Sequence, residues 1–106
     1  MSSKEKSAKQ RRAERPREVA YTKTFNKDWD RYYRAGKIDL NRVKEAMLLL
    51  IANSGPLGPE WLEHGLIGDY DGFLECHVGG DLLLIYQMDK SRVSFVRMGT
   101  HAELFE

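Results

Sequence analysis

The stretch that decides the fold spans residues 71–105 and reads DGFLECHVGGDLLLIYQMDKSRVSFVRMGTHAELF. It alternates runs of aliphatic, aromatic and β-branched residues with short turn sequences, a pattern typical of consecutive antiparallel strands. Since each turn reverses the chain, the stretch predicts an up-down-up meander. The predicted strands are residues 72–78, 82–88 and 92–98, and the predicted turns are residues 79–81 (Gly-Gly-Asp) and 89–91 (Asp-Lys-Ser).

Side chains of the first predicted strand alternate between two faces of the sheet. Leu74, Cys76 and Val78 share one face, which is apolar and is expected to pack on the core. Glu75 and His77 lie on the other face. We therefore expect His77 to point away from the core.

The residues before this stretch predict one strand, two helices and a loop. Residues 18–25 are rich in β-branched and aromatic residues, which favours a strand. Aromatic residues recur every three or four positions in residues 25–35, which favours a helix with Thr24 as its N-cap and Gly36 as its end. Residues 56–68 contain Gly and Pro and predict a loop.

A second helix is expected between Asp39, its predicted N-cap, and the breaker sequence Asn-Ser-Gly-Pro at residues 53–56. The short link between the helices predicts an antiparallel hairpin. The element order β-α-α-β-β-β predicts an α+β domain, with an antiparallel sheet and a helical hairpin packed on one face. The expected buried stripe of the second helix is Leu40, Val43, Met47, Leu50 and Ile51.

Length and composition limit the possible classes of protein. The 106 residues suffice for one domain with one hydrophobic core. No apolar run approaches the roughly 18 residues that suggest a membrane span. The single cysteine, Cys76, excludes an internal disulfide and a cysteine-rich zinc site, which favours a reducing, cytoplasmic environment.

Charge is unevenly distributed along the chain. Residues 1–20 contain seven basic and three acidic residues, a net charge of +4, which leaves −3 for the rest because the whole chain carries +1. Residues 1–17 therefore predict a basic, flexible N-terminal arm ahead of a domain at residues 18–106. Such an arm is compatible with nucleic-acid contact, although a solvated tail is the more common explanation.

The three histidines are candidate functional residues, because imidazole transfers protons near neutral pH. His77 ends the first strand of the meander and His101 follows the third, and alternate strands of a meander end at the same edge. Asp81 begins the strand between them, and Arg97 lies near the end of the third. We expect these residues to converge, with His64 contributed by the preceding loop.

Other chemistries are weaker options for these residues. His64, His77, His101 and Asp81 are adequate zinc ligands, but their spacing matches no compact zinc motif. Cys76 is expected to face the core, where a thiol is usually inert.

Arg97 suits a phosphodiester substrate. A guanidinium group can hold a non-bridging oxygen and stabilise charge that grows on phosphorus. The alternative for Arg97 is a surface salt bridge. Its alternation with Val93 and Phe95 predicts that it lies on an apolar face of the sheet.

Several short motifs occur together in this chain. They are Leu66-x-Gly68, Gly72-Phe73, His77-Val78, Asp81-x-x-Leu84-Ile85-Tyr86, Arg97 and Gly99-Thr100-His101-x-x-Leu104-Phe105. In this combination, residues 19–106 resemble the RelE/ParE superfamily of bacterial toxins, and within it the YafQ-type messenger RNA endoribonucleases.

The resemblance implies an endoribonuclease toxin of a type II toxin–antitoxin system. Such toxins enter the ribosomal A site and cut the mRNA, and a cognate antitoxin neutralises them by covering the active site. The positions that match the active-site residues of the family are His64, His77, Asp81, Arg97, His101 and Phe105.

The implied reaction is attack of the RNA 2′-hydroxyl on the adjacent phosphate. Asp81 or one of the first two histidines would accept the 2′ proton, His101 would protonate the leaving oxygen, and Phe105 would stack on a base. No metal or other cofactor is then needed, because the 2′-hydroxyl is an internal nucleophile.

Two positions depart from the pattern of the family. Leu74 stands where an arginine is usual, and Leu82 stands where a tryptophan is usual. These changes would remove a cation and a stacking surface from RNA binding. They favour an alternative function, that of a non-catalytic ParE-like toxin that acts by binding DNA gyrase.

Overall fold

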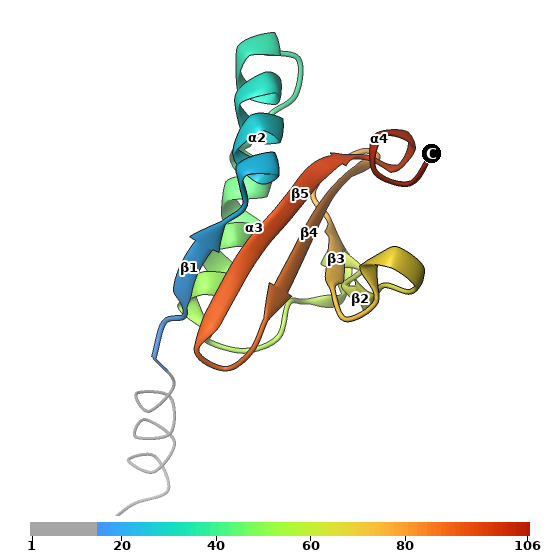
Figure 1. The fold of residues 1–106 in the computed structure, drawn as a ribbon. Coiled ribbons are helices and arrows are strands. Elements are labelled where there is room, and N and C mark those ends of the chain that lie inside the picture. Colours follow the sequence, from blue (N-terminus) through green and yellow to red (C-terminus); the bar gives the residue numbers. More distant parts are fainter. Residues whose placement is uncertain (1–14) are drawn as a thin grey trace, which may run out of the picture.

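The computed structural model describes residues 15–106, and Figure 1 shows their five-stranded sheet, with α2 and α3 beside β1 and β5. The predicted α+β class is confirmed. Residues 1–14, most of the predicted basic arm, lie outside the described residues. The strands are β1 (Glu18–Tyr21), β2 (His64–Gly65), β3 (Leu74–His77), β4 (Leu82–Met88) and β5 (Arg92–Thr100). The helices are α2 (Lys23–Ala35), α3 (Asn41–Ala52) and α4 (His101–Phe105), with 3₁₀ turns η1 (Pro59–Trp61) and η2 (Gly68–Tyr70).

The sheet has the order β1-β5-β4-β3-β2, and β3, β4 and β5 form the predicted meander. β4 has the predicted bounds, β3 is shorter than predicted, and β5 continues to Thr100. β1 pairs in parallel with β5, so the sheet is mixed rather than wholly antiparallel. β2 forms inside the predicted loop, because a strand of two residues is too short to show alternation in the sequence.

α2 begins earlier than predicted. Thr22, rather than Thr24, is the N-cap, and its hydroxyl accepts a 2.9 Å hydrogen bond from the Phe25 amide. β1 consequently ends at Tyr21. Gly36 ends α2 in the left-handed conformation, with a φ of 64°, as predicted.

α3 runs in the direction opposite to α2, as the hairpin prediction requires, and continues past the N-terminal end of α2 (Figure 1). Leu40 is its N-cap residue, but the Asp39 carboxylate accepts a 2.9 Å hydrogen bond from the Asn41 amide and so contributes to the cap. The predicted stripe packs on the core, with Leu40, Val43 and Leu50 buried and Met47 and Ile51 partly buried.

The sheet buries apolar side chains on both faces, which explains why residues 82–86 form a continuous apolar run. Leu82, Leu84 and Tyr86 join the main core with α2 and α3. Leu83 and Ile85 join a smaller cluster on the opposite face, where α4 contributes Leu104 and the partly buried members are Leu66, Tyr70, Phe73 and Val96.

A β-bulge changes the direction of side chains within β5. Ile85 of β4 pairs with Arg97 while its neighbour Tyr86 pairs with Phe95, so Val96 is the extra residue. Phe95 faces the main core, whereas Arg97 lies on the opposite face, in register with Ile85. The prediction that Arg97 shares a face with Phe95 is therefore wrong, because the bulge breaks the alternation.

The edge of β5 beyond Phe95 is covered by α2 rather than by β1. The last pair between β1 and β5 joins Tyr21 to Phe95. The Thr22 hydroxyl donates to the Val96 carbonyl at 2.7 Å, and Asp28 of α2 accepts from the Met98 amide at 3.0 Å. These side chains satisfy backbone groups that a longer β1 would otherwise pair.

Asp28 also forms a two-point ion pair with Arg97. Its carboxylate oxygens lie 3.0 Å from Arg97 Nε and 3.1 Å from Arg97 Nη2. Asp28 is only 4% exposed, so its charge depends on these donors. The Asp28 contacts thus join α2 to β5 at the centre of the fold.

We predict that Asp28→Ala lowers the free energy of unfolding by about 2–4 kcal/mol, because it leaves the Met98 amide and the Arg97 guanidinium without their acceptor. Urea denaturation measures this loss. Asp30→Ala is the matched control on the same helix, since Asp30 forms an exposed pair with Arg34 and should lose less than about 1 kcal/mol. Equal losses in the two variants would contradict the prediction.

Candidate active site

A pocket of about 400 Å³ opens on the sheet face opposite the main core. It brings together five of the six predicted site residues. They come from β2, the end of β3, the turn before β4, and both ends of α4. Its lining consists of His64, Leu66, Ile67, Glu75, His77, Asp81, Leu83, His101 and Phe105.

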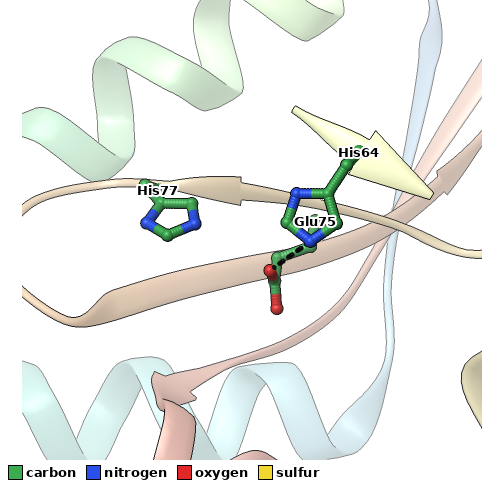
Figure 2. Close-up of side chains that lie close together, drawn as sticks. All are labelled: His64, Glu75 and His77. Atoms are coloured by element: carbon green, nitrogen blue, oxygen red, sulfur yellow. Dashed lines mark ion pairs between the residues drawn. The ribbon is translucent and has the colours of Figure 1, made fainter. Parts of the chain in front are cut away.

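The strand register explains the inner part of this pocket. His64 pairs with Glu75, and His77 follows two residues later on the same face of β3. His64 Nε2 lies 2.9 Å from Glu75 Oε2, and the centroids of the His64 and His77 rings are 6.2 Å apart. Figure 2 shows the two imidazoles on either side of the Glu75 carboxylate.

Glu75 is the site residue that the sequence-based prediction missed. It is only 5% exposed, and its Oε1 has no hydrogen-bond partner among residues 15–106. A buried carboxylate is costly unless it is paired, so its retention here points to a functional or strongly paired role. The feature of the sequence that could have identified Glu75 is its position on the same face of the strand as His77.

His64 is held at both ring nitrogens. Nδ1 lies 2.9 Å from the Leu62 carbonyl, while Nε2 faces the Glu75 carboxylate. Both contacts are to oxygen atoms of the protein, one in a backbone carbonyl and one in a carboxylate. They fix the position of the ring beside the buried Glu75 carboxylate.

The loop before His64 is anchored to the core. The Tyr86 hydroxyl donates to Glu63, and burial raises the pKa of Tyr86 far above its ordinary value, with further contributions from Cys76 and Glu63. Trp61 is buried, and the Arg42 guanidinium carbon lies 3.7 Å from the centroid of its ring. These contacts hold His64 at the edge of the sheet.

His101 and Phe105 are presented by α4, which the sequence did not predict. The Thr100 hydroxyl accepts from the Glu103 amide at 3.2 Å, and the Glu103 carboxylate accepts from the Thr100 amide at 2.9 Å, which makes a capping box. The His101 and Phe105 rings lie 5.1 Å apart, and Phe105 meets the edge of Tyr70 at 5.7 Å. His101 is exposed at the mouth of the pocket.

Glu103 links α4 to α2 through side-chain hydrogen bonds. Its carboxylate accepts hydrogen bonds from the Tyr32 hydroxyl and the Arg31 guanidinium. Burial alone would raise the pKa of Glu103, but the Thr100 amide, Tyr32 and Arg31 together lower it to about 2. The position of His101 thus depends on a contact between α4 and α2.

Arg97 is the predicted site residue that the structure does not bring into the pocket. It lies on the pocket face, but its guanidinium binds Asp28, and this hydrogen bond raises the pKa of Arg97 above its ordinary value. Among residues 15–106, Arg97 therefore forms a partly buried ion pair with Asp28. Its predicted contact with phosphate stays a prediction.

The structure also locates three other residues considered in the sequence. Leu82 is buried in the main core and Leu74 packs against it, so both face away from the pocket. The expectation that these residues remove a stacking surface and a cation from the site is therefore wrong for a site on the pocket face. Cys76 is fully buried, and burial raises the pKa of its thiol to about 12, which confirms that it faces the core.

Comparison with known proteins places this chain in a family. Residues 17–106 match the family described as "Bacterial toxin of type II toxin-antitoxin system, YafQ". The chain belongs to the YafQ family. The sequence-based resemblance to YafQ-type toxins is thereby confirmed.

Three known proteins are similar to this chain over most of its length. The mRNA interferase toxin YafQ of Escherichia coli (strain K12) is 37% identical over 89 residues, which cover 84% of this chain and 96% of that protein. The E. coli DinJ–YafQ toxin–antitoxin complex contains a chain with 36% identity and a TM-score of 0.78, covering 86% of this chain and 99% of that one. A metal-bound toxin from Helicobacter pylori has 34% identity and a TM-score of 0.70, covering 83% of this chain and 98% of that one.

We predict that Glu103→Gln destabilises this YafQ-family protein by roughly 1–2 kcal/mol near neutral pH, a modest figure because the carboxylate is partly exposed to screening solvent. The pKa of Glu103 is depressed, so its stabilising effect is complete above about 4.5 and disappears as pH falls through about 2. Stability measured from pH 6 to pH 2 should therefore fall less steeply in Glu103→Gln than in the unchanged protein.

Glu106→Gln serves as the control for this measurement, because Glu106 is exposed and does not contact α2 among residues 15–106. Its pH profile should follow that of the unchanged protein. Identical slopes for Glu103→Gln and the unchanged protein would show that Glu103 does not carry the effect.

Proposed function

We propose that this toxin cleaves mRNA in the pocket by attack of the 2′-hydroxyl on the adjacent phosphate. The observation that carries the proposal is the different bonding of three histidines around one pocket. His64 has both ring nitrogens engaged, whereas His77 has no hydrogen bond to any group in residues 15–106 and His101 has only a 3.4 Å contact with Glu106. An imidazole whose two nitrogens are already in contact with protein groups and one whose nitrogens are not are suited to different catalytic roles.

His64 is suited to a positioning role rather than to proton transfer. Both of its ring nitrogens already contact protein oxygen atoms, in the Leu62 carbonyl and the Glu75 carboxylate. Glu75 is a positioning residue in this scheme, because it holds the His64 ring. This assignment leaves His77 and Asp81 as the candidates for the base that accepts the 2′ proton.

His77 is the better base of these two. Its ring lines the pocket and, when neutral, offers a free nitrogen lone pair to the 2′-hydroxyl proton. Asp81 is an exposed carboxylate at the rim of the pocket, and imidazole is the side chain best suited to proton transfer near neutral pH. His101, across the pocket mouth, then donates a proton to the leaving 5′ oxygen, and Phe105 stacks on a neighbouring base.

The comparisons support this class of activity. The predicted function, that of an endoribonuclease toxin, agrees with the description of the family, and the two E. coli relatives are named mRNA interferase toxins. We propose by the same reasoning that a cognate antitoxin binds this chain, as DinJ binds YafQ in the E. coli complexes, and that the toxin acts on ribosome-bound mRNA in the cytoplasm. Within residues 15–106, no helix is long and apolar enough to cross a membrane.

We predict that His77→Gln and His101→Gln each lower the rate of mRNA cleavage by about 10²–10⁴-fold, the range expected for loss of a general acid or base. Primer extension on mRNA in a translating extract measures the rate. Asp30→Ala is the matched control and should cleave at the unchanged rate, because Asp30 lies on α2 and outside the pocket lining.

Two outcomes would contradict the proposal. Undiminished cleavage by His101→Gln would exclude His101 as the acid. Growth arrest without mRNA cleavage, and with a block in DNA replication, would instead support the ParE-like alternative.

A further inference from the structure

We propose that Ile67 forms the second wall of a slot that holds one base of the mRNA, opposite the base-stacking ring of Phe105. The proposal rests on the function proposed for the same pocket, in which Phe105 stacks on a base. It adds a substrate-binding residue at the position that the motif Leu66-x-Gly68 leaves open.

The lining of the pocket divides into a polar part and an apolar part. The polar part includes His77, Asp81 and His101, between which the proposed proton transfers take place. Since a nucleotide joins a charged phosphate and a sugar to a base with two flat faces, the two parts suit the two halves of one nucleotide. The apolar part consists of Leu66, Ile67, Leu83 and Phe105.

Exposure separates the members of the apolar part into a floor and two walls. Leu83 is buried and Leu66 is partly buried, and both belong to the small apolar cluster on this face of the sheet. Ile67 is 89% exposed and Phe105 is 37% exposed. Ile67 therefore adds little to the stability of the fold, but its apolar surface would leave water on contact with a base.

The loop that carries Ile67 is held on both sides. Before Ile67, the Leu66 amide donates to the Phe73 carbonyl at 2.9 Å, which extends the pairing of β2 with β3. After Ile67, the Asp71 amide donates to the Gly68 carbonyl at 3.0 Å and closes η2. Because the backbone is already ordered, binding a base requires little further ordering of this wall.

The opposite wall is also held in place. The Tyr70 ring lies 5.7 Å from the Phe105 ring at an interplanar angle of 79°, and the His101 ring lies 5.1 Å away at 45°. Neither ring lies parallel to Phe105 as a stacked base would. The two neighbours therefore support Phe105 without taking the place of the base.

The kinetic effect of Ile67 follows from its place in the pocket. Ile67 would contact the base and not the reacting atoms, so its contribution is the same before and during the reaction. Ile67→Ser should therefore raise the half-saturating toxin concentration about tenfold and leave the maximal rate unchanged. Single-turnover cleavage of labelled mRNA on programmed ribosomes, with the toxin in varied excess, measures both quantities.

Two variants control this measurement. Ile67→Leu keeps an apolar side chain and should restore most of the affinity. Leu48→Ser removes an exposed apolar side chain from α3, outside the pocket lining, and should change neither quantity. An unchanged half-saturating concentration in Ile67→Ser would overturn the proposal, while the proposed cleavage reaction would stand.

A second measurement tests the slot without reference to cleavage. Ribosome-bound mRNA carries 2′-O-methyl groups in the A-site codon, which block the nucleophile, and 2-aminopurine at each of the three positions in turn. Stacking quenches the fluorescence of 2-aminopurine, so titration with the full chain should quench it at one position. Ile67→Ser and Phe105→Ala should each weaken binding, and the double variant should lose less than the product of the two losses, because both walls hold one base.

The outcomes of the second measurement are distinct from those of the cleavage assay. Absence of quenching by the unchanged protein at all three positions, or losses that simply multiply in the double variant, would overturn the proposal. If unmodified mRNA is not cleaved although Ile67→Ser weakens binding of the blocked mRNA, the proposed function fails and the slot is supported.

Discussion

The edge of β5 that β1 leaves uncovered is the constraint on which the rest of the structure depends. β1 pairs with β5 only as far as Phe95, although β5 continues to Thr100. The remaining backbone groups require partners, and Thr22 and Asp28 provide them at Val96 and Met98. This requirement places α2 across the end of the sheet, where Arg31 and Tyr32 can bind α4.

The functional pocket is a consequence of that arrangement together with the two buried faces of β4. Leu83 and Ile85 cover the face opposite the helices with a small apolar cluster, and the polar groups of β2 and β3 lie beside it. Glu75 is buried there without a full set of hydrogen bonds from the described part of the chain, which is unfavourable for stability alone. Proteins retain such groups at sites where a ligand or a reaction uses them.

Structural features that depend on residues close together in the sequence were predictable. The bounds of β4, the core-facing position of Cys76 and the convergence of His77, Asp81 and His101 all follow from alternation and from the geometry of a meander. His64 was expected from the loop that precedes the meander, and the family motifs extended these predictions to Phe105. Glu75 was placed on the correct face but was not recognised, because an isolated glutamate on a strand is ordinarily exposed.

Other features depend on contacts between distant segments. β2 is identified only by its pairing with β3, and α4 is held by Glu103, whose partners lie about 70 residues earlier in the chain. The bulge at Val96 reverses the direction of the Arg97 side chain, and no pattern in the neighbouring residues predicted this bulge. The pair between Arg97 and Asp28 spans α2 and β5 and therefore had no signature in either segment alone.

The sequence by itself determined the α+β class, the meander, and which titratable residues lie near one edge of the sheet. It could do so because hydrophobic periodicity and turn residues act over a few positions. Only the tertiary structure decided the hydrogen-bond partners of those residues. It fixed His64 between Leu62 and Glu75, left the His77 ring without a hydrogen bond to residues 15–106, and held Arg97 at Asp28 rather than in the pocket. The physical reason is that the charge and availability of a side chain depend on burial and on partners that long-range packing brings to it.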